Sequence, residues 1–121
     1  KMNFKLKKKL HFIVITLLIW VLYLIMTFFA MKALASTSQL NIIDAFFLLV
    51  IGSYGFAAPV QAGIGAYHGI IALGLSLYNI SWSDGLAYAV LSHGSQAISI
   101  IALGLISMLF LSFRKKVNKA I

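Results

Sequence analysis

The chain has 121 residues, of which 62% are hydrophobic and 10% charged, and its mean hydropathy is +1.01. An ordinary soluble domain is far less apolar, so the composition indicates an integral membrane protein. The net charge is +8, but the basic residues gather at the two ends instead of covering a folded polar face, so no nucleic-acid partner is expected. The absence of cysteine excludes disulfides, thiol nucleophiles and thiolate metal sites.

Two basic clusters bracket the apolar part of the chain. The first is the segment 1–9, the second is the tail 114–121, and only Lys32 carries a positive charge between them. Basic residues stay on the cytoplasmic side of membrane spans, so we predict that both termini are cytoplasmic. Each basic residue near a membrane surface also attracts anionic phospholipid, by about 1 kcal/mol.

The first apolar run covers 10–31, which is long enough to cross a hydrocarbon core of roughly 30 Å. Apolar residues surround the whole helix, so the run predicts a membrane span. A short polar loop at 36–39 follows, which this topology places on the external side. Asn41 is the predicted N-cap of the next helix.

Two shorter apolar runs, 42–58 and 64–80, lie on either side of a turn at Pro59–Gly63. Both are at the lower limit of length for a span, so they either cross the membrane twice or form a re-entrant hairpin that enters from outside and returns. The turn carries no basic residue, which favours the re-entrant hairpin. Proline lacks a backbone donor and glycine permits unusual backbone angles, so we predict a non-helical turn, buried in protein within the membrane.

Small residues form a stripe along the second short run, where they let another helix approach closely; these are Gly65, Gly69, Ala72 and Ser76. Ser81 and Asp84 then resemble a capping box ahead of the last apolar run. We place the last span at 84–113, long enough to cross with tilt. The predicted fold is an all-α membrane bundle in which two long spanning helices enclose a short, broken, re-entrant hairpin.

The turn carries the sequence PVQAGIGAYH at 59–68. It resembles the Pro-x-Pro-Gly-Gly-x-Gly-x-x-Glu signature of the lysylphosphatidylglycerol synthase transmembrane-region family, which are flippase-like integral membrane proteins. Pro59, Gly63 and Gly65 match this signature, whereas Gln61 replaces the second proline and His68 replaces the acid.

The resemblance identifies the chain as the C-terminal part of a polytopic bacterial inner-membrane protein that moves lipid between leaflets. The 121 residues contain no soluble synthase domain, so aminoacyl transfer is not implied and no enzyme activity is expected.

Polar and turn-forming residues in two segments are the predicted lipid or head-group path, because broken backbone and ionisable groups at membrane depth usually serve a function. The path residues are Pro59, Gln61, Gly63, Gly65, Tyr67, His68, Ser92, His93 and Gln96. For His68, a structural hydrogen bond to a neighbouring group is an equal alternative. The serines fit interhelical hydrogen bonds better than a path, while His93 with Gln96 slightly favours a cavity.

The remaining polar residues do not predict a catalytic or metal site. Asp44 and Asp84 both fall in the first turn of a helix, where a negative charge is favoured, and do not make an acid–base pair. His11, His68 and His93 share no metal-ligand spacing, and no cofactor motif is present. The predicted function is therefore lipid translocation. The alternative is a helical assembly module that packs against further helices of a larger protein or against copies of itself.

Overall fold

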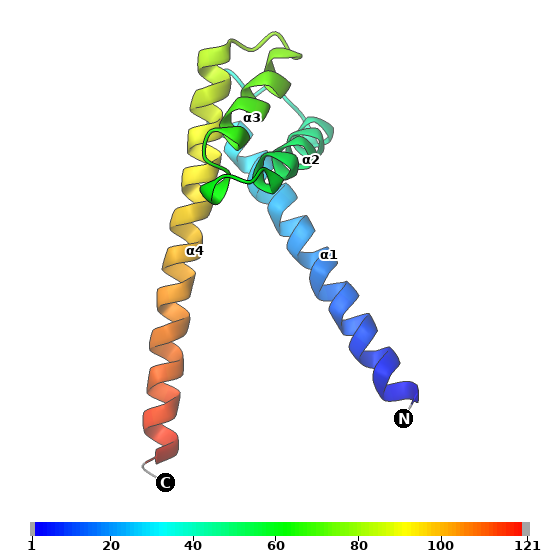
Figure 1. The fold of residues 1–121 in the computed structure, drawn as a ribbon, viewed down its shortest axis with the longest axis vertical. Helices are drawn as coiled ribbons and strands as arrows, with labels where there is room; N and C mark the ends of the chain where they lie inside the picture. Colours follow the sequence, from blue (N-terminus) through cyan, green and yellow to red (C-terminus); the bar gives the residue numbers. More distant parts are fainter. Residues whose placement is uncertain (1, 120–121) are drawn as a thin grey trace. The chain divides into compact units, whose positions relative to one another are not determined.

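The computed structural model describes residues 2–119, with side chains described for residues 6–112. In chain order it consists of α1 (Met2–Lys32), α2 (Ile42–Ala57), the 3₁₀ turn η1 (Gln61–Gly63), α3 (Ala66–Ser76) and α4 (Trp82–Lys119), as Figure 1 shows. No strand occurs among the described residues. The predicted all-α class, with two long apolar helices and a shorter one between them, is confirmed.

Two helices are long and apolar enough to cross a membrane, over Leu6–Lys32 in α1 and Trp82–Ser112 in α4. Both extend further than the predicted spans, because α1 includes residues of the basic segment and α4 continues to Lys119. Lysine is a good helix former, and neither glycine nor proline interrupts the chain at these points, so the helices continue past the apolar runs.

The chain divides into two compact units, residues 1–89 and residues 90–121. The first unit holds α1, α2, η1, α3 and the beginning of α4. The second consists of the rest of α4. From Ile98 to Leu111, every large apolar side chain is at least 58% exposed, which suits contact with lipid or with another membrane helix.

In the first unit, α2 and α3 form an antiparallel hairpin. Near the turn, a Cβ placed on Gly55 would lie 2.6 Å from Tyr67 Cα. Further from the turn, Gly74 of α3 contacts the Ile51 side chain, and the Phe47 ring lies 6.0 Å from the Tyr78 ring. Later residues of α2 thus meet earlier residues of α3, and the missing glycine side chains allow the two backbones to lie close together.

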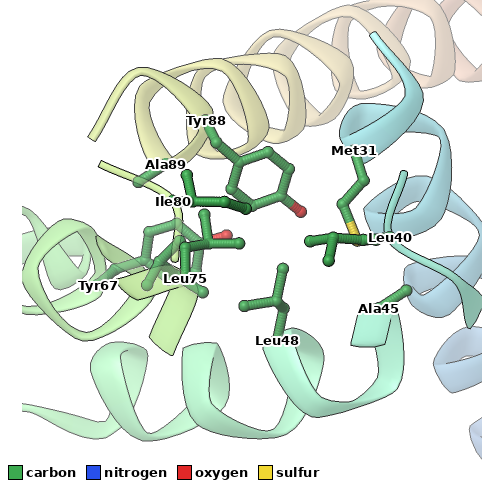
Figure 2. Close-up of a cluster of buried hydrophobic side chains, with 10 residues drawn as sticks. Met31, Leu40, Ala45, Leu48, Tyr67, Leu75, Ile80, Tyr88 and Ala89 are labelled. Atoms are coloured by element: carbon green, nitrogen blue, oxygen red, sulfur yellow. The ribbon is translucent and has the colours of Figure 1, made fainter. Parts of the chain in front are cut away.

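The core of the first unit gathers side chains from all four helices (Figure 2). Met31 comes from α1, Leu48 from α2, Leu75 from α3 and Tyr88 from α4, and each is at most 1% exposed. The Tyr88 hydroxyl donates a hydrogen bond of 3.3 Å to the Thr27 carbonyl of α1. Tyr88 therefore ties the beginning of α4 to α1 through both packing and a polar contact.

Capping residues fix the starts of α2 and α4. Asn41 Oδ1 accepts a bond of 2.7 Å from the Ile43 N–H, and the Asn41 N–H donates to the Asp44 carboxylate at 2.8 Å. Before α4, Ser81 Oγ accepts from the Asp84 N–H at 3.2 Å and donates to the Asp84 carboxylate at 2.6 Å. Both predicted N-caps are confirmed, although the Asp84 carboxylate meets the Ser81 hydroxyl instead of a backbone N–H.

The loop between α1 and α2 closes onto the end of α1. The buried Thr37 hydroxyl donates a bond of 2.7 Å to the Met31 carbonyl, and Lys32 Nζ donates to the Ser38 carbonyl and, at 2.7 Å, to the Leu40 carbonyl. These donors satisfy carbonyl groups at and beyond the end of the helix, which have no partner inside it. The loop is thereby held against the end of α1.

Candidate site at the turn of the broken hairpin

The helix α2 ends at Ala57 because Pro59 follows shortly after it. Ala58 precedes Pro59 and is extended, with φ −62° and ψ 143°, as the residue before a proline usually is. After η1 begins, Ala62 and Gly63 adopt positive φ angles of 53° and 69°. The predicted non-helical turn is confirmed, with one short 3₁₀ turn inside it.

The helix α3 starts at Ala66, slightly later than the predicted run, because Gly65 has a φ of 86°. It also ends earlier than predicted, at Ser76, where the chain turns and Asn79 adopts a φ of 59°. Left-handed angles cannot continue a right-handed helix. The hairpin therefore has one long and one short arm.

The prediction that the turn is buried in protein is wrong for this chain. Pro59 and Gln61 are exposed, Val60 is 46% exposed, and only Gly63 is buried. Part of the backbone of the turn is satisfied locally: the Gly63 N–H donates to the Val60 carbonyl at 3.2 Å, and the Ile64 N–H donates to the Gln61 carbonyl at 3.1 Å.

The aromatic ring of Phe56, in α2, packs against the turn. A Cβ placed on Gly63 would lie 2.9 Å from the Phe56 ring, so Gly63 packs directly against it. The Phe56 and Tyr67 rings lie 4.6 Å apart at 34°, and Tyr67 is 6% exposed. Tyr67, a predicted path residue, therefore belongs to the core packing and lies against the Phe56 ring that contacts Gly63.

His68 lies in the first turn of α3 and is half-buried. Its ring meets the Tyr67 ring edge to face at 5.9 Å and 87°, and its Nδ1 atom is buried. The structure thus connects Gly63, Tyr67 and His68 through ring contacts: Gly63 and Tyr67 both pack against Phe56, and His68 packs against Tyr67.

Among the residues of the predicted small-residue stripe, Ala72 makes a close contact with another helix. Ala72 is fully buried, and a Cβ placed on Gly85 of α4 would lie 2.8 Å from Ala72 Cα. A Cβ placed on Gly65 or Gly69 would meet no atom within 4 Å, and Ser76 is exposed. The tight contacts of the hairpin lie instead at Gly52, Gly55 and Gly74, whose packing role the sequence analysis missed.

The predicted path residues of α4 lie in the second unit, so they form a separate group. Ser92 is 3% exposed, while His93 and Gln96 are half-buried. The neighbouring serines bond to their own helix: Ser95 Oγ donates to the Ser92 carbonyl at 2.9 Å, and Ser99 Oγ donates to the Ser95 carbonyl at 2.7 Å. The hydroxyls of Ser95 and Ser99 are therefore engaged within the helix.

A polar contact closes the end of the hairpin opposite the turn. The Tyr78 hydroxyl donates a hydrogen bond to the Asp44 carboxylate. Partial burial, followed by this bond and the negative charge of Asp44, raises the pKa of Tyr78. The sequence analysis assigned Asp44 only to the helix start, since Asp44 and Tyr78 are far apart in the sequence. Among residues with described side chains, no group of three potential metal ligands occurs.

Two helices of the described chain are long and apolar enough to cross a membrane, and a broken hairpin lies between them in the sequence. The family model described as "Lysylphosphatidylglycerol synthase TM region" matches residues 4–104. The chain therefore belongs to the lysylphosphatidylglycerol synthase transmembrane-region family, whose members are membrane proteins involved in lipid handling, and the predicted resemblance is confirmed. No curated protein and no solved structure matches the chain at a significant level.

Proposed function

We propose that this chain is part of a protein that moves a phospholipid or a lipid-linked head group across the bacterial inner membrane. Both termini are cytoplasmic, the chain carries no catalytic step of its own, and its basic ends contact anionic phospholipid. The observation that carries the proposal is the open turn at 58–65, which joins two short helices in a member of a lipid-handling membrane family.

The lengths of the two short helices favour a re-entrant hairpin. At 1.5 Å per residue, the 16 residues of α2 extend about 24 Å and the 11 residues of α3 extend about 16 Å. Both are shorter than a hydrocarbon core of roughly 30 Å. Since α3 is far too short to cross, we place the turn inside the membrane and both open ends of the hairpin at the external surface.

The chemistry of the turn suits a polar head group. Irregular backbone at membrane depth is tolerated where it lines a cavity or a binding site. Gln61 is exposed there, and its amide can donate to phosphate oxygens or accept from hydroxyl groups. His68 supplies an imidazole in the first turn of α3. Because an imidazole lacks the fixed negative charge of the acid in the family signature, this site favours head groups that do not depend on a carboxylate.

A paired measurement on His68→Ala tests the proposal. The wild type and the variant are reconstituted into liposomes, and transfer of a fluorescent phospholipid between leaflets is measured together with thermal stability in detergent. We expect the variant to transfer lipid several-fold more slowly while its stability is nearly unchanged, because the ring acts on the head group. His11→Ala is the matched control, since His11 is exposed in α1 and remote in sequence from the turn.

The opposite pattern would contradict the role of His68. If transfer is unchanged while stability falls by roughly 1–3 kcal/mol, the loss of a structural hydrogen bond explains the variant. If the wild-type protein itself transfers no lipid in liposomes, the proposed function fails and the assembly module remains.

A further inference from the structure

One side chain at the end of α2 contacts both of the segments that follow it in the hairpin. Phe56 is the second-to-last residue of α2, which ends at Ala57. Its ring packs against Gly63 of η1 and lies 4.6 Å from the Tyr67 ring of α3, at 34°. The Phe56 ring therefore joins α2, the turn and α3 at a single point.

The backbone of η1 needs support from outside. Ala62 has φ 53° and ψ 21°, a left-handed conformation that is unfavourable for alanine. Residues in such conformations persist where the surrounding structure holds them. Gly63 follows with φ 69°, and a Cβ placed on it would lie 2.9 Å from the Phe56 ring and 3.3 Å from Phe56 Cα. The contact between Phe56 and Gly63 supplies that support directly after the strained residue.

Both side chains proposed to meet the head group are linked to this ring. Gln61 is the first residue of η1 and Gly63 is its last, so a contact that fixes Gly63 also restricts the position of Gln61. On the α3 side, the Tyr67 ring is 6% exposed and meets the His68 ring edge to face at 5.9 Å and 87°. Tyr67, held between two rings, therefore transmits the packing of Phe56 to His68.

We propose that Phe56 is the positioning residue of the turn. Its ring holds Gly63, and with it Gln61, on one side, and orients His68 through Tyr67 on the other. A phenyl ring has no hydrogen-bonding group, so Phe56 acts on the site through packing alone. The part that this positioning has in lipid transfer rests on the function proposed above.

A spin label at position 61 tests the positioning without any measurement of transfer. Gln61→Cys is labelled in the cysteine-free chain and reconstituted into liposomes, alone and together with Phe56→Ala, Phe56→Tyr or Phe46→Ala. We expect the label to become more mobile with Phe56→Ala and to keep its original mobility with Phe56→Tyr, which restores the ring. Phe46→Ala is the matched control, since Phe46 lies ten positions earlier in α2 and is 57% exposed, and it should leave the label unchanged.

Transfer of a fluorescent phospholipid is then measured with position 61 unsubstituted and normalised to the folded protein. Phe56→Ala should slow transfer several-fold, and Phe56→Tyr should restore it. Phe56→Leu, which keeps apolar volume without the ring, replaces Phe56→Ala if the latter does not fold, and should show the same two effects more weakly.

Two results would overturn the positioning role: unchanged mobility at position 61 when the ring is removed, or an equal increase with Phe46→Ala. Increased mobility with unchanged transfer would also overturn it, because the ring would then position nothing that transfer needs. If the wild-type chain transfers no lipid, the proposed function fails, and the label at position 61 still decides whether Phe56 holds the turn.

Discussion

Different kinds of contact stabilise the two ends of the α2–α3 hairpin. At the end opposite the turn, Asn41 caps α2, and Tyr78 contacts both Asp44 and Phe47, which lie more than 30 positions earlier in the sequence. At the turn, Pro59 and Gln61 are exposed, and the backbone bonds are local. Contacts thus hold the hairpin together at the end opposite the turn and along its two helices, while few contacts hold the turn itself.

This difference explains how a broken helix can persist in a membrane protein. Close contacts at glycines such as Gly55 and Gly74 keep the two arms together, so the turn does not have to contribute packing energy. The turn keeps its shape through Pro59 and its left-handed residues, and it presents polar groups outward. Substitutions in the arms should therefore affect stability, whereas those in the turn should affect lipid transfer.

The largest stability effect is expected for Gly55→Ala. The added Cβ would lie 2.6 Å from Tyr67 Cα and 3.0 Å from Tyr67 N, and because these are backbone atoms the two helices must move apart. Overpacking of this kind costs about 1–3 kcal/mol. Chemical or thermal unfolding in detergent measures the change in the free energy of unfolding.

Gly69→Ala is the matched control on the opposite arm. A Cβ at Gly69 would meet no atom within 4 Å, and alanine is a better helix former than glycine by up to about 1 kcal/mol. The control should be neutral or slightly stabilising. Equal destabilisation by both substitutions would contradict the account of how the arms pack.

A smaller effect is expected for Tyr78→Phe, which removes the hydrogen bond to Asp44 at the end of the hairpin opposite the turn. The pKa of Tyr78 is raised in the folded protein, so the folded state holds this proton more tightly than the unfolded state. The contribution of Tyr78 is therefore complete below about pH 10, the ordinary pKa of tyrosine, and is lost as the pH rises toward the raised value.

The thermal stability of wild type and Tyr78→Phe is compared as a function of pH. Below about pH 10 the variant should be less stable, by about 1 kcal/mol or less for one hydrogen bond at a partly exposed site. Above that pH the two stabilities should converge. A constant difference across the whole range would show that the Tyr78 proton does not contribute.

Much of the fold could be predicted because local signals determine it. The N-caps at Asn41 and Ser81 depend on residues only three positions apart, and the end of α2 follows from Pro59. The two long helices follow from uninterrupted apolar runs in the sequence. In these regions the local preference and the final structure agree.

Contacts between helices could not be predicted in the same way. Gly65 and Gly69 have the spacing of a packing motif, yet Gly52 and Gly55 make the close contacts in this chain. Which glycine meets another helix depends on the register of the two arms, and that register is set by the turn and by the whole core. The candidate site was predictable as a segment, but the core position of Tyr67 was not, because periodicity does not reveal which side of a short helix is covered.

The depth of Gln61 in the bilayer tests the central claim, an open turn held inside the membrane, most directly. Gln61→Cys and Ser38→Cys are each introduced into the cysteine-free chain, labelled with a fluorophore and reconstituted with lipids that carry a quencher on the acyl chain. The account predicts strong acyl-chain quenching at position 61, and reaction of position 38 with an impermeant reagent from the external side only. Rapid labelling of position 61 by the same reagent from the cytoplasmic side would contradict it, because the hairpin would then cross the membrane twice.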